Sequence, residues 1–391
     1  MKLSMFADTK FLADGKGNLY TSSNMRKAML YPIADRFEKL YLVCRVRQGD
    51  LSHIPVEDLI NHPKIEIVGA PYFKGVFGSL LWRNEILPKI HYAIERSDVC
   101  VLRFGSNISC LTLPVVERMH KPSIGHVIGN FGMEIEKNPK HIPIPGLRQL
   151  VAGWMVKRAT RAFQACDLLC GVTETIARRY AQPDREVFQL IDSCLSEECY
   201  SSPKQNDNES IKAIFAGRLV EFKNVQNFLH AIARVRQDKV EINAIVVGDG
   251  DFKNQLVELA RQLNIEKNVE FTGRVESRRE LWRKYRSADI GFLLSFSEGL
   301  PLGAIEPMSV GLPLLAARLD YMEPIVTDGV EGFLVDPGNV DEISEKLKVL
   351  ATRPDLRNKM ALAAYEKSKL FSAENQAIKL FQMADKLCKK V

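Results

Sequence analysis

From residue 211 onward, short apolar runs alternate regularly with segments of helical length. Strands that are apolar almost throughout are typical of parallel sheets, because helices cover both faces of such a sheet. The alternation therefore predicts a doubly wound α/β domain in the second half of the chain. The β-rich runs are IKAIFAG, EINAIVVG, NVEFTG, ADIGFLLS, LPLLAA and GFLVDP.

The first half carries similar runs at less regular intervals, and they predict a second parallel sheet. A chain of 391 residues exceeds what one hydrophobic core usually organises. The stretch SSPKQNDNES at 201–210 is polar and lacks periodic apolar residues, as interdomain linkers do. We therefore predict an N-terminal Rossmann-like domain over 1–200 and a C-terminal one over 205–371.

Composition places the chain among ordinary folded proteins, with 46% hydrophobic and 26% charged residues. No apolar run reaches the roughly 18 residues that a spanning helix needs, and the first residues lack the apolar core of a secretory signal. We therefore expect a cytoplasmic protein. Its eight cysteines form no C-x-x-C pair, so we expect them to be reduced and mostly buried.

A basic segment stands out at 137–161, where six Lys and Arg residues occur among apolar ones without any acidic residue. Three interpretations remain open. The segment is a solvated basic helix, a peripheral contact with an anionic membrane such as the inner face of the plasma membrane, or a site for a lipid diphosphate acceptor. Nucleic acid is not an expected partner, because no dense basic tract interleaved with aromatic residues is present.

Ligands of open parallel sheets bind beyond the carboxyl ends of the strands, so the residues that follow each predicted strand are the candidates for a site. Arg218 follows the first strand of the second half, and Lys223 comes five residues later before a helix. Two cations at one strand edge suit a diphosphate. Gly248 follows the next strand in the sequence GDGD, which we interpret as a turn rather than a metal motif.

The segment SEGLPLGAIEP contributes two carboxylates, Glu298 and Glu306. Pro301 suits the first position of a helix, and Glu306 lies five residues beyond it, roughly 7 to 8 Å along a helix axis. This spacing allows one carboxylate at the mouth of a site and one deeper, with a nucleotide sugar between them.

Five segments in order resemble the motifs of the retaining glycosyltransferases of the sucrose-synthase and phosphatidylinositol-mannosyltransferase superfamily. This resemblance implies the GT-B fold, in which two facing Rossmann-like domains enclose a central cleft. It also implies that the final helix, 372–391, packs back on the N-terminal domain. The segments are GRLVEFKN, VVGDGD, VEFTGRV, SEGLPLGAIEPMSVGLP and DGVEGFLVDPGN.

The same resemblance implies roles for individual residues. Arg218 and Lys223 would neutralise the donor diphosphate, Glu298 would contact the transferred sugar, and Glu306 would bind the ribose hydroxyls. No metal or other cofactor would be needed. The remaining donor contacts expected from the motifs are Gly248, the backbone near Arg274 and Val275, and the loop and helix start formed by Gly299, Leu300, Pro301 and Leu302.

Two residues depart from the family pattern: Asn224 stands where glycine is usual, and Pro307 where alanine is usual. Because proline disfavours helical geometry at the residue before it, we expect a kink at Glu306 that alters the ribose contact.

The first half resembles the family only weakly. The sequence DGKGN, with Gly15 and Gly17, occupies the place of a glycine-rich loop that approaches the diphosphate. Arg103, His126 and Asn130 lie at predicted strand ends that face the cleft and are candidate sugar or acceptor contacts. A histidine within a β-rich run is more often a core residue, so a core role stays open for His126, and likewise for Asn130.

These residues predict transfer of a hexose from a nucleoside-diphosphate sugar to a hydroxyl of a glycan or lipid-linked acceptor, and the resemblance implies retention of configuration. It also suggests a place in lipopolysaccharide, capsule or other glycan assembly. Two alternatives stay open: a nucleotide-sugar epimerase or hydrolase on the same fold, and a catalytically silent subunit that binds nucleotide sugars.

Overall fold

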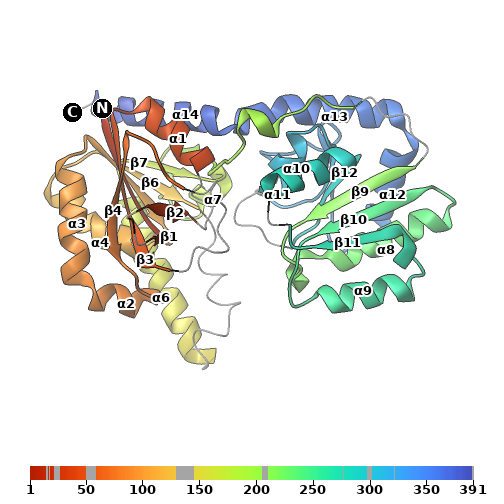
Figure 1. Cartoon of the computed structure of the whole chain (residues 1–391), viewed down its shortest axis with the longest axis horizontal. Helices are drawn as coiled ribbons and strands as arrows, with labels where there is room; N and C mark the ends of the chain where they lie inside the picture. Colours follow the sequence, from red (N-terminus) through yellow and green to blue (C-terminus); the bar gives the residue numbers. More distant parts are fainter. Residues whose placement is uncertain are drawn as a thin grey trace. The chain divides into compact units, whose positions relative to one another are not determined.

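The computed structural model describes residues 1–14, 16, 18–21, 27–49, 59–128, 145–204, 210–275, 277–296, 302–320 and 322–389. The chain divides into two compact units (Figure 1). The first comprises Met1–Cys194 with Ala373–Val391, and the second comprises Leu195–Ser372.

The first unit is built on a sheet whose strand order is β4-β3-β1-β5-β6-β7-β8, and all of these neighbours pair in parallel. The short β2 pairs antiparallel with the end of β1. The strands are β1 (Lys2–Ala13), β2 (Leu19–Thr21), β3 (Lys39–Gln48), β4 (Ile65–Pro71), β5 (Val99–Phe104), β6 (Ser123–Val127), β7 (Leu168–Gly171) and β8 (Val187–Gln189).

Helices cover this sheet, and the last helix of the chain is one of them. α14 packs on α1 and contributes Ala377, Leu380 and Ala384 to the first hydrophobic core. Gln376 of α14 also accepts a hydrogen bond from the buried backbone N–H of Ile191 at 2.8 Å. The helices are α1 (Lys27–Arg36), α2 (Gly75–Leu81), α3 (Arg83–Glu95), α4 (Asn107–Arg118), α6 (Pro145–Gln164), α7 (Glu174–Arg178) and α14 (Ala373–Cys388).

The second unit has a fully parallel sheet of order β11-β10-β9-β12-β13-β14. Its six strands lie on the six apolar runs named above, so the predicted doubly wound sheet is confirmed. The strands are β9 (Ile211–Ala216), β10 (Ile242–Val247), β11 (Val269–Gly273), β12 (Ile290–Leu293), β13 (Leu314–Ala317) and β14 (Gly332–Val335). The helices are α8 (Val225–Gln237), α9 (Lys253–Gln262), α10 (Arg278–Ser287), α11 (Leu302–Met308), α12 (Val340–Thr352) and α13 (Pro354–Ser368).

The boundary between the units falls between Cys194 and Leu195. It therefore comes before the polar stretch at 201–210 that we predicted as the interdomain linker. The reason lies in the segment that precedes this stretch. Leu195 and Cys199 are buried, and the indole N–H of Trp282 in α10 donates to the carbonyl of Cys199 at 2.6 Å. Residues 195–204 therefore pack as part of the second unit. Among the described helices, none is both long and apolar enough to cross a membrane.

Candidate functional site

At the carboxyl edge of the second sheet, the loops that follow β9, β10 and β12 are hydrogen-bonded to one another or to the end of a neighbouring strand. After β9, the N–H of Gly217 donates to the carbonyl of Val247 in β10 at 3.0 Å. After β10, the N–H of Gly248 donates to the carbonyl of Gly273 in β11 at 2.9 Å. After β12, the N–H of Phe296 donates to the carbonyl of Phe222 at 2.9 Å. The fold thus brings the loops that carry Arg218, Lys223 and Arg274 to one edge of one sheet.

Lys223 ends a short 3-10 turn, Glu221–Lys223, that joins β9 to α8. The next residue, Asn224, has a left-handed backbone with φ of 58° and caps the start of α8. Its buried side-chain amide donates to the carbonyl of Pro337 at 2.6 Å. Asparagine tolerates this conformation better than most residues other than glycine, which explains the departure from the family's glycine.

The glycines of the GDGD turn are required by contacts within the protein. Gly248 has φ of +135°, and a Cβ built there would overlap the carbonyl oxygen of Gly217. A Cβ at Gly250 would overlap the carbonyl oxygen of Leu219 in the same way. The close approach that we expected a ligand to make is therefore already made here by the loop after β9, the loop that holds Arg218.

Glu306 lies on α11, and two side chains of α10 hold its carboxylate. The hydroxyl of Tyr285 donates to it at 3.3 Å, and Nη1 of Arg278 lies 3.8 Å from its other oxygen. Burial and the Glu306 charge raise the pKa of Tyr285 well above its usual value, so this phenol stays a proton donor. Sequence reasoning missed both partners. Their spacing of seven residues on a predicted helix places them on one face and is the signal that could have identified them.

Pro307 does not end the helix at Glu306, because α11 continues to Met308. The buried proline ring packs toward Gly291 of β12, where a Cβ would lie 3.2 Å from Cβ of Pro307. Gly291 and Pro307 thus allow α11 to pack closely against β12 at this point.

The other predicted residues fall into two groups. Arg218 and Arg274 are exposed, and Val275 and Leu302 are half-buried, on the loops just described and at the start of α11. Seven predicted contacts lie outside the described residues: Gly15, Gly17, Asn130, Glu298, Gly299, Leu300 and Pro301.

Arg103 and His126 do not face a ligand site, because both side chains are buried in the first unit. Arg103 at the end of β5 forms an ion pair with the buried carboxylate of Asp192. The ring of His126 bonds the carbonyl of Leu190 through Nε2 at 2.8 Å, and its Nδ1 lies 3.7 Å from Asp192. Burial lowers the pKa of His126, so the neutral ring donates to that carbonyl. Both residues thus lie in the core. For His126 this agrees with the core interpretation left open above, and for Arg103 it differs from the expected ligand contact.

The stretch DGKGN stands between the antiparallel strands β1 and β2 in the sequence, and its Gly15 and Gly17 lie outside the described residues. The carboxylate of Asp14 accepts from the side-chain amide of Asn18 at 2.7 Å and from the backbone N–H groups of Lys16 and Asn18, each at 2.8 Å, and these hydrogen bonds lower the pKa of Asp14. Asp14 therefore has a structural role in this turn.

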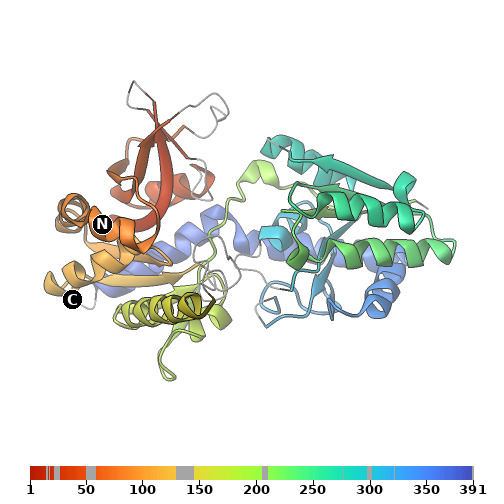
Figure 2. The same ribbon diagram turned by 90° about the horizontal axis from the view of Figure 1, so that it is seen from below.

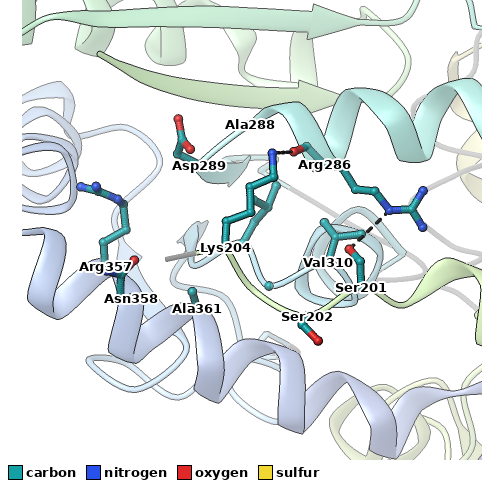
Figure 3. Close-up of a pocket in the computed structure, with 12 residues that line it drawn as sticks. Ser201, Ser202, Lys204, Arg286, Ala288, Asp289, Val310, Arg357, Asn358 and Ala361 are labelled. Atoms are coloured by element: carbon teal, nitrogen blue, oxygen red, sulfur yellow. Dashed lines mark hydrogen bonds between the residues drawn. The ribbon is translucent and has the colours of Figure 1, made fainter. Parts of the chain in front are cut away.

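A pocket lies elsewhere among the described residues, at the amino-terminal edge of the second sheet (Figure 3). It has a volume of about 140 Å³ and is lined by residues that precede β12 and β13, such as Asp289 and Leu312. Two of its cationic side chains are hydrogen-bonded within the protein. Lys204 donates to the carbonyl of Arg286, and Arg286 donates to Ser201 at 3.3 Å (Figure 3). Within the described part of the chain, no three metal-ligating side chains gather.

Residues 197–367 match the family model described as glycosyl transferases group 1. A D-inositol 3-phosphate glycosyltransferase of Kribbella flavida is 31% identical over 175 residues, which are 42% of this chain and 41% of that protein. The alpha-monoglucosyldiacylglycerol synthase of Streptococcus pneumoniae is 33% identical over 153 residues, 39% of this chain and 34% of that one. These alignments span less than half of either relative.

Solved structures match over the whole chain. HepE of Anabaena, in complex with UDP, has a TM-score of 0.70 at 15% identity, and sucrose-phosphate synthase of Thermosynechococcus elongatus has 0.71 at 14%. Each comparison covers 100% of both chains. At this identity the likeness shows the fold alone. Residues 197–367 are thus similar to the glycosyl transferases group 1, and the two parallel-sheet units of the chain have the GT-B fold.

Proposed function

We propose that this chain is a glycosyltransferase that moves a sugar from a nucleoside diphosphate to a hydroxyl of a glycan or lipid-linked acceptor. The observation that carries the proposal is the carboxyl edge of the second sheet, where the loop that holds Arg218 and Lys223 is hydrogen-bonded to the loops after β10 and β12. The group 1 family match over the same unit supports it. HepE was solved with UDP-glucose, a donor of the class that we propose for this chain.

Arg218 and Lys223 neutralise the diphosphate in this proposal. Arg218 is exposed on the loop after β9, and the Lys223 ammonium lies 5.6 Å from the ring centroid of Phe222, whose carbonyl accepts from Phe296. Phe296, which bonds this turn, stands two residues before Glu298 in the sequence. We assign Glu298 the contact with the transferred sugar.

Glu306 binds the ribose hydroxyls, and the backbone of Arg274 and Val275 receives the base. Tyr285 and Arg278 act as positioning residues, because they orient the Glu306 carboxylate from α10. Gly248 lets the loop after β10 pack against the loop of Arg218. We also propose that the anomeric configuration of the sugar is retained and that the transfer needs no metal.

Charge develops on the departing diphosphate during transfer, so electrostatic stabilisation dominates the chemistry. A cation that is already in place lowers the barrier without reorganisation, and the loss of one such group typically costs about 10²- to 10³-fold in rate. Water must be excluded from the donor, since hydrolysis competes with transfer.

The test is product analysis with a panel of nucleotide sugars and acceptors. We expect a glycosylated acceptor, and a loss of about 10²- to 10³-fold in transfer for Lys223→Ala and for Glu298→Ala. Lys267→Ala, an exposed lysine on a turn before β11, is the matched control and keeps full activity. Free sugar or an isomerised donor without any acceptor would instead identify a hydrolase or an epimerase. Donor binding with no turnover would identify a silent binding subunit.

A further inference from the structure

Helix α6 presents an unusual exposed side. Leu150 is 73% exposed and Trp154 is 51% exposed, and Lys157 and Arg161 continue the same exposed stripe. The spacing of four, three and four residues places these side chains on one face of the helix. The opposite face is buried in the first unit through Ala159, Ala162 and Phe163.

The exposed stripe is divided along the helix axis. Its apolar side chains occupy the first half of α6 and its cations the second half, about 16 Å from Leu150 to Arg161 at 1.5 Å per residue. Residues 145–164 contain no acidic residue. Among the described side chains of 145–154, Ala152 alone is buried, so this half of the helix stands clear of the core. Figure 1 shows α6, in yellow, reaching beyond the end of the sheet.

A second exposed apolar cluster lies at the turn between α2 and α3. Leu80 is 46% exposed, Leu81 is 85% exposed and Trp82 is 41% exposed. Arg83, the first residue of α3, is an exposed cation beside this turn, and the exposed Glu85 follows two residues later. Both α2 and α6 pack on α4, and Figures 1 and 2 place them at the same end of the first unit.

We propose that this end of the first unit docks on an anionic phospholipid bilayer. We call the surface formed by the exposed side chains of 80–82 and of 150–161 the α6 tip surface. Large apolar residues that are exposed beside cations match the two layers of a bilayer interface, since Leu enters the acyl boundary while Lys and Arg remain at the headgroups. Tryptophan is enriched at this depth, and Arg158 lies 5.5 Å from the ring centroid of Trp154.

The charge of α6 favours an anionic lipid surface over a protein as the partner of this surface. The exposed face of α6 carries cations only, and a negatively charged leaflet attracts each Lys or Arg near its surface. The surface lies in the first unit and shares no residue with the proposed donor site. The membrane proposal can therefore be tested independently of the proposed sugar transfer.

The first test is flotation of the full chain with phosphatidylcholine vesicles that contain about one third phosphatidylglycerol. We expect binding to these vesicles and not to pure phosphatidylcholine. Lys157→Glu with Arg161→Glu should lower the partition coefficient about 25-fold or more, since each cation contributes about fivefold. Leu81→Ser with Leu150→Ser should lower it at least tenfold.

Matched controls come from the second unit. Leu362→Ser removes a leucine of α13 that is 55% exposed, and Lys267→Glu reverses an exposed charge. Both should bind vesicles as the unchanged chain does. Thermal unfolding of every variant verifies that the fold is kept.

The tryptophans supply a second, independent readout. The chain has three, and Trp282 is buried at 3% exposure, whereas Trp82 and Trp154 both lie in the α6 tip surface. We expect a blue shift of the emission on adding anionic vesicles. Trp82→Phe and Trp154→Phe should each reduce this shift.

Three results would overturn the proposal. The first is the absence of binding to anionic vesicles, and the second is equal loss of binding in the control variants. The third is self-association or capture of a protein that the α6 tip variants abolish while vesicles remain unbound, because it would assign the surface to a protein partner.

Discussion

Asn224 shows how one residue fixes the loop that carries Lys223. Its φ of 58° is left-handed, and its amide holds the carbonyl of Pro337. Asn224→Ala should destabilise the protein by about 2 to 3 kcal/mol, because alanine adopts this conformation at a cost of about 1 to 2 kcal/mol and the hydrogen bond is lost as well.

Asn224→Gly is the matched control, because it keeps the backbone freedom and loses only the hydrogen bond. The carbonyl of Pro337 still accepts from Asn227 at 2.8 Å, so we expect a loss of about 1 kcal/mol. Thermal unfolding of the full chain measures both variants. Equal destabilisation by alanine and glycine would show that the left-handed backbone is not what selects asparagine.

His126 makes the stability of the protein depend on pH. Burial lowers its pKa, the nearby Asp192 raises it, and the nearby Arg103 lowers it, with a net lowering. The unfolded chain therefore takes up a proton near pH 6.5 that the folded chain refuses, so stability is full above this pH and falls as the pH drops toward the folded pKa.

His126→Gln, which retains a donor for Leu190, should remove this contribution. Between about pH 7.5 and pH 5.5, we expect the stability of the unchanged chain to fall more steeply than that of the variant, by up to about 1.4 kcal/mol per pH unit. Thermal unfolding at several pH values provides the comparison. Parallel pH profiles for the two proteins would contradict the assignment.

At the scale of elements, α10 and α11 act together, since α10 supplies the two groups that hold Glu306. Tyr285→Phe removes one hydrogen bond to this carboxylate and leaves the ring in place. If Glu306 holds the ribose equally well before and during transfer, KM for the donor should rise about fivefold to tenfold with kcat unchanged. Arg279→Ala, an exposed change on the same helix, is the control. A fall in kcat with unchanged KM would assign Tyr285 to the chemical step.

The sequence predicted the elements of the second unit well because each parallel strand is a nearly continuous apolar run with buried faces. It predicted the strand-end positions of Arg218, Lys223 and Gly248 for the same reason. It left the role of His126 open and took Arg103 for a ligand contact, because their partner Asp192 lies far along the chain and only the fold brings it near. Tyr285 was missed because its role depends on how α10 packs beside α11.

At the scale of the whole molecule, the chain builds most of one unit, then the other, and returns to complete the first with α14. We predicted the domain boundary later in the chain than it lies in the structure. The reason is that residues 195–204 are polar in sequence but are hydrogen-bonded to α10 and α13. Tyr200, for example, donates to the carbonyl of Ser368 at 3.1 Å. The division into two units places the family match, 197–367, within one unit that has its own core.

The central claim is that the carboxyl edge of the second sheet holds a nucleoside diphosphate through Arg218 and Lys223. Calorimetric titration of the full chain with UDP, GDP and ADP tests it most directly, with Lys223→Met and Arg218→Met beside Lys267→Met as the control. We predict that at least one of the three nucleotides binds, and that each of the first two variants weakens its binding about tenfold or more while the control does not. Affinity that is the same in all four proteins would contradict the account.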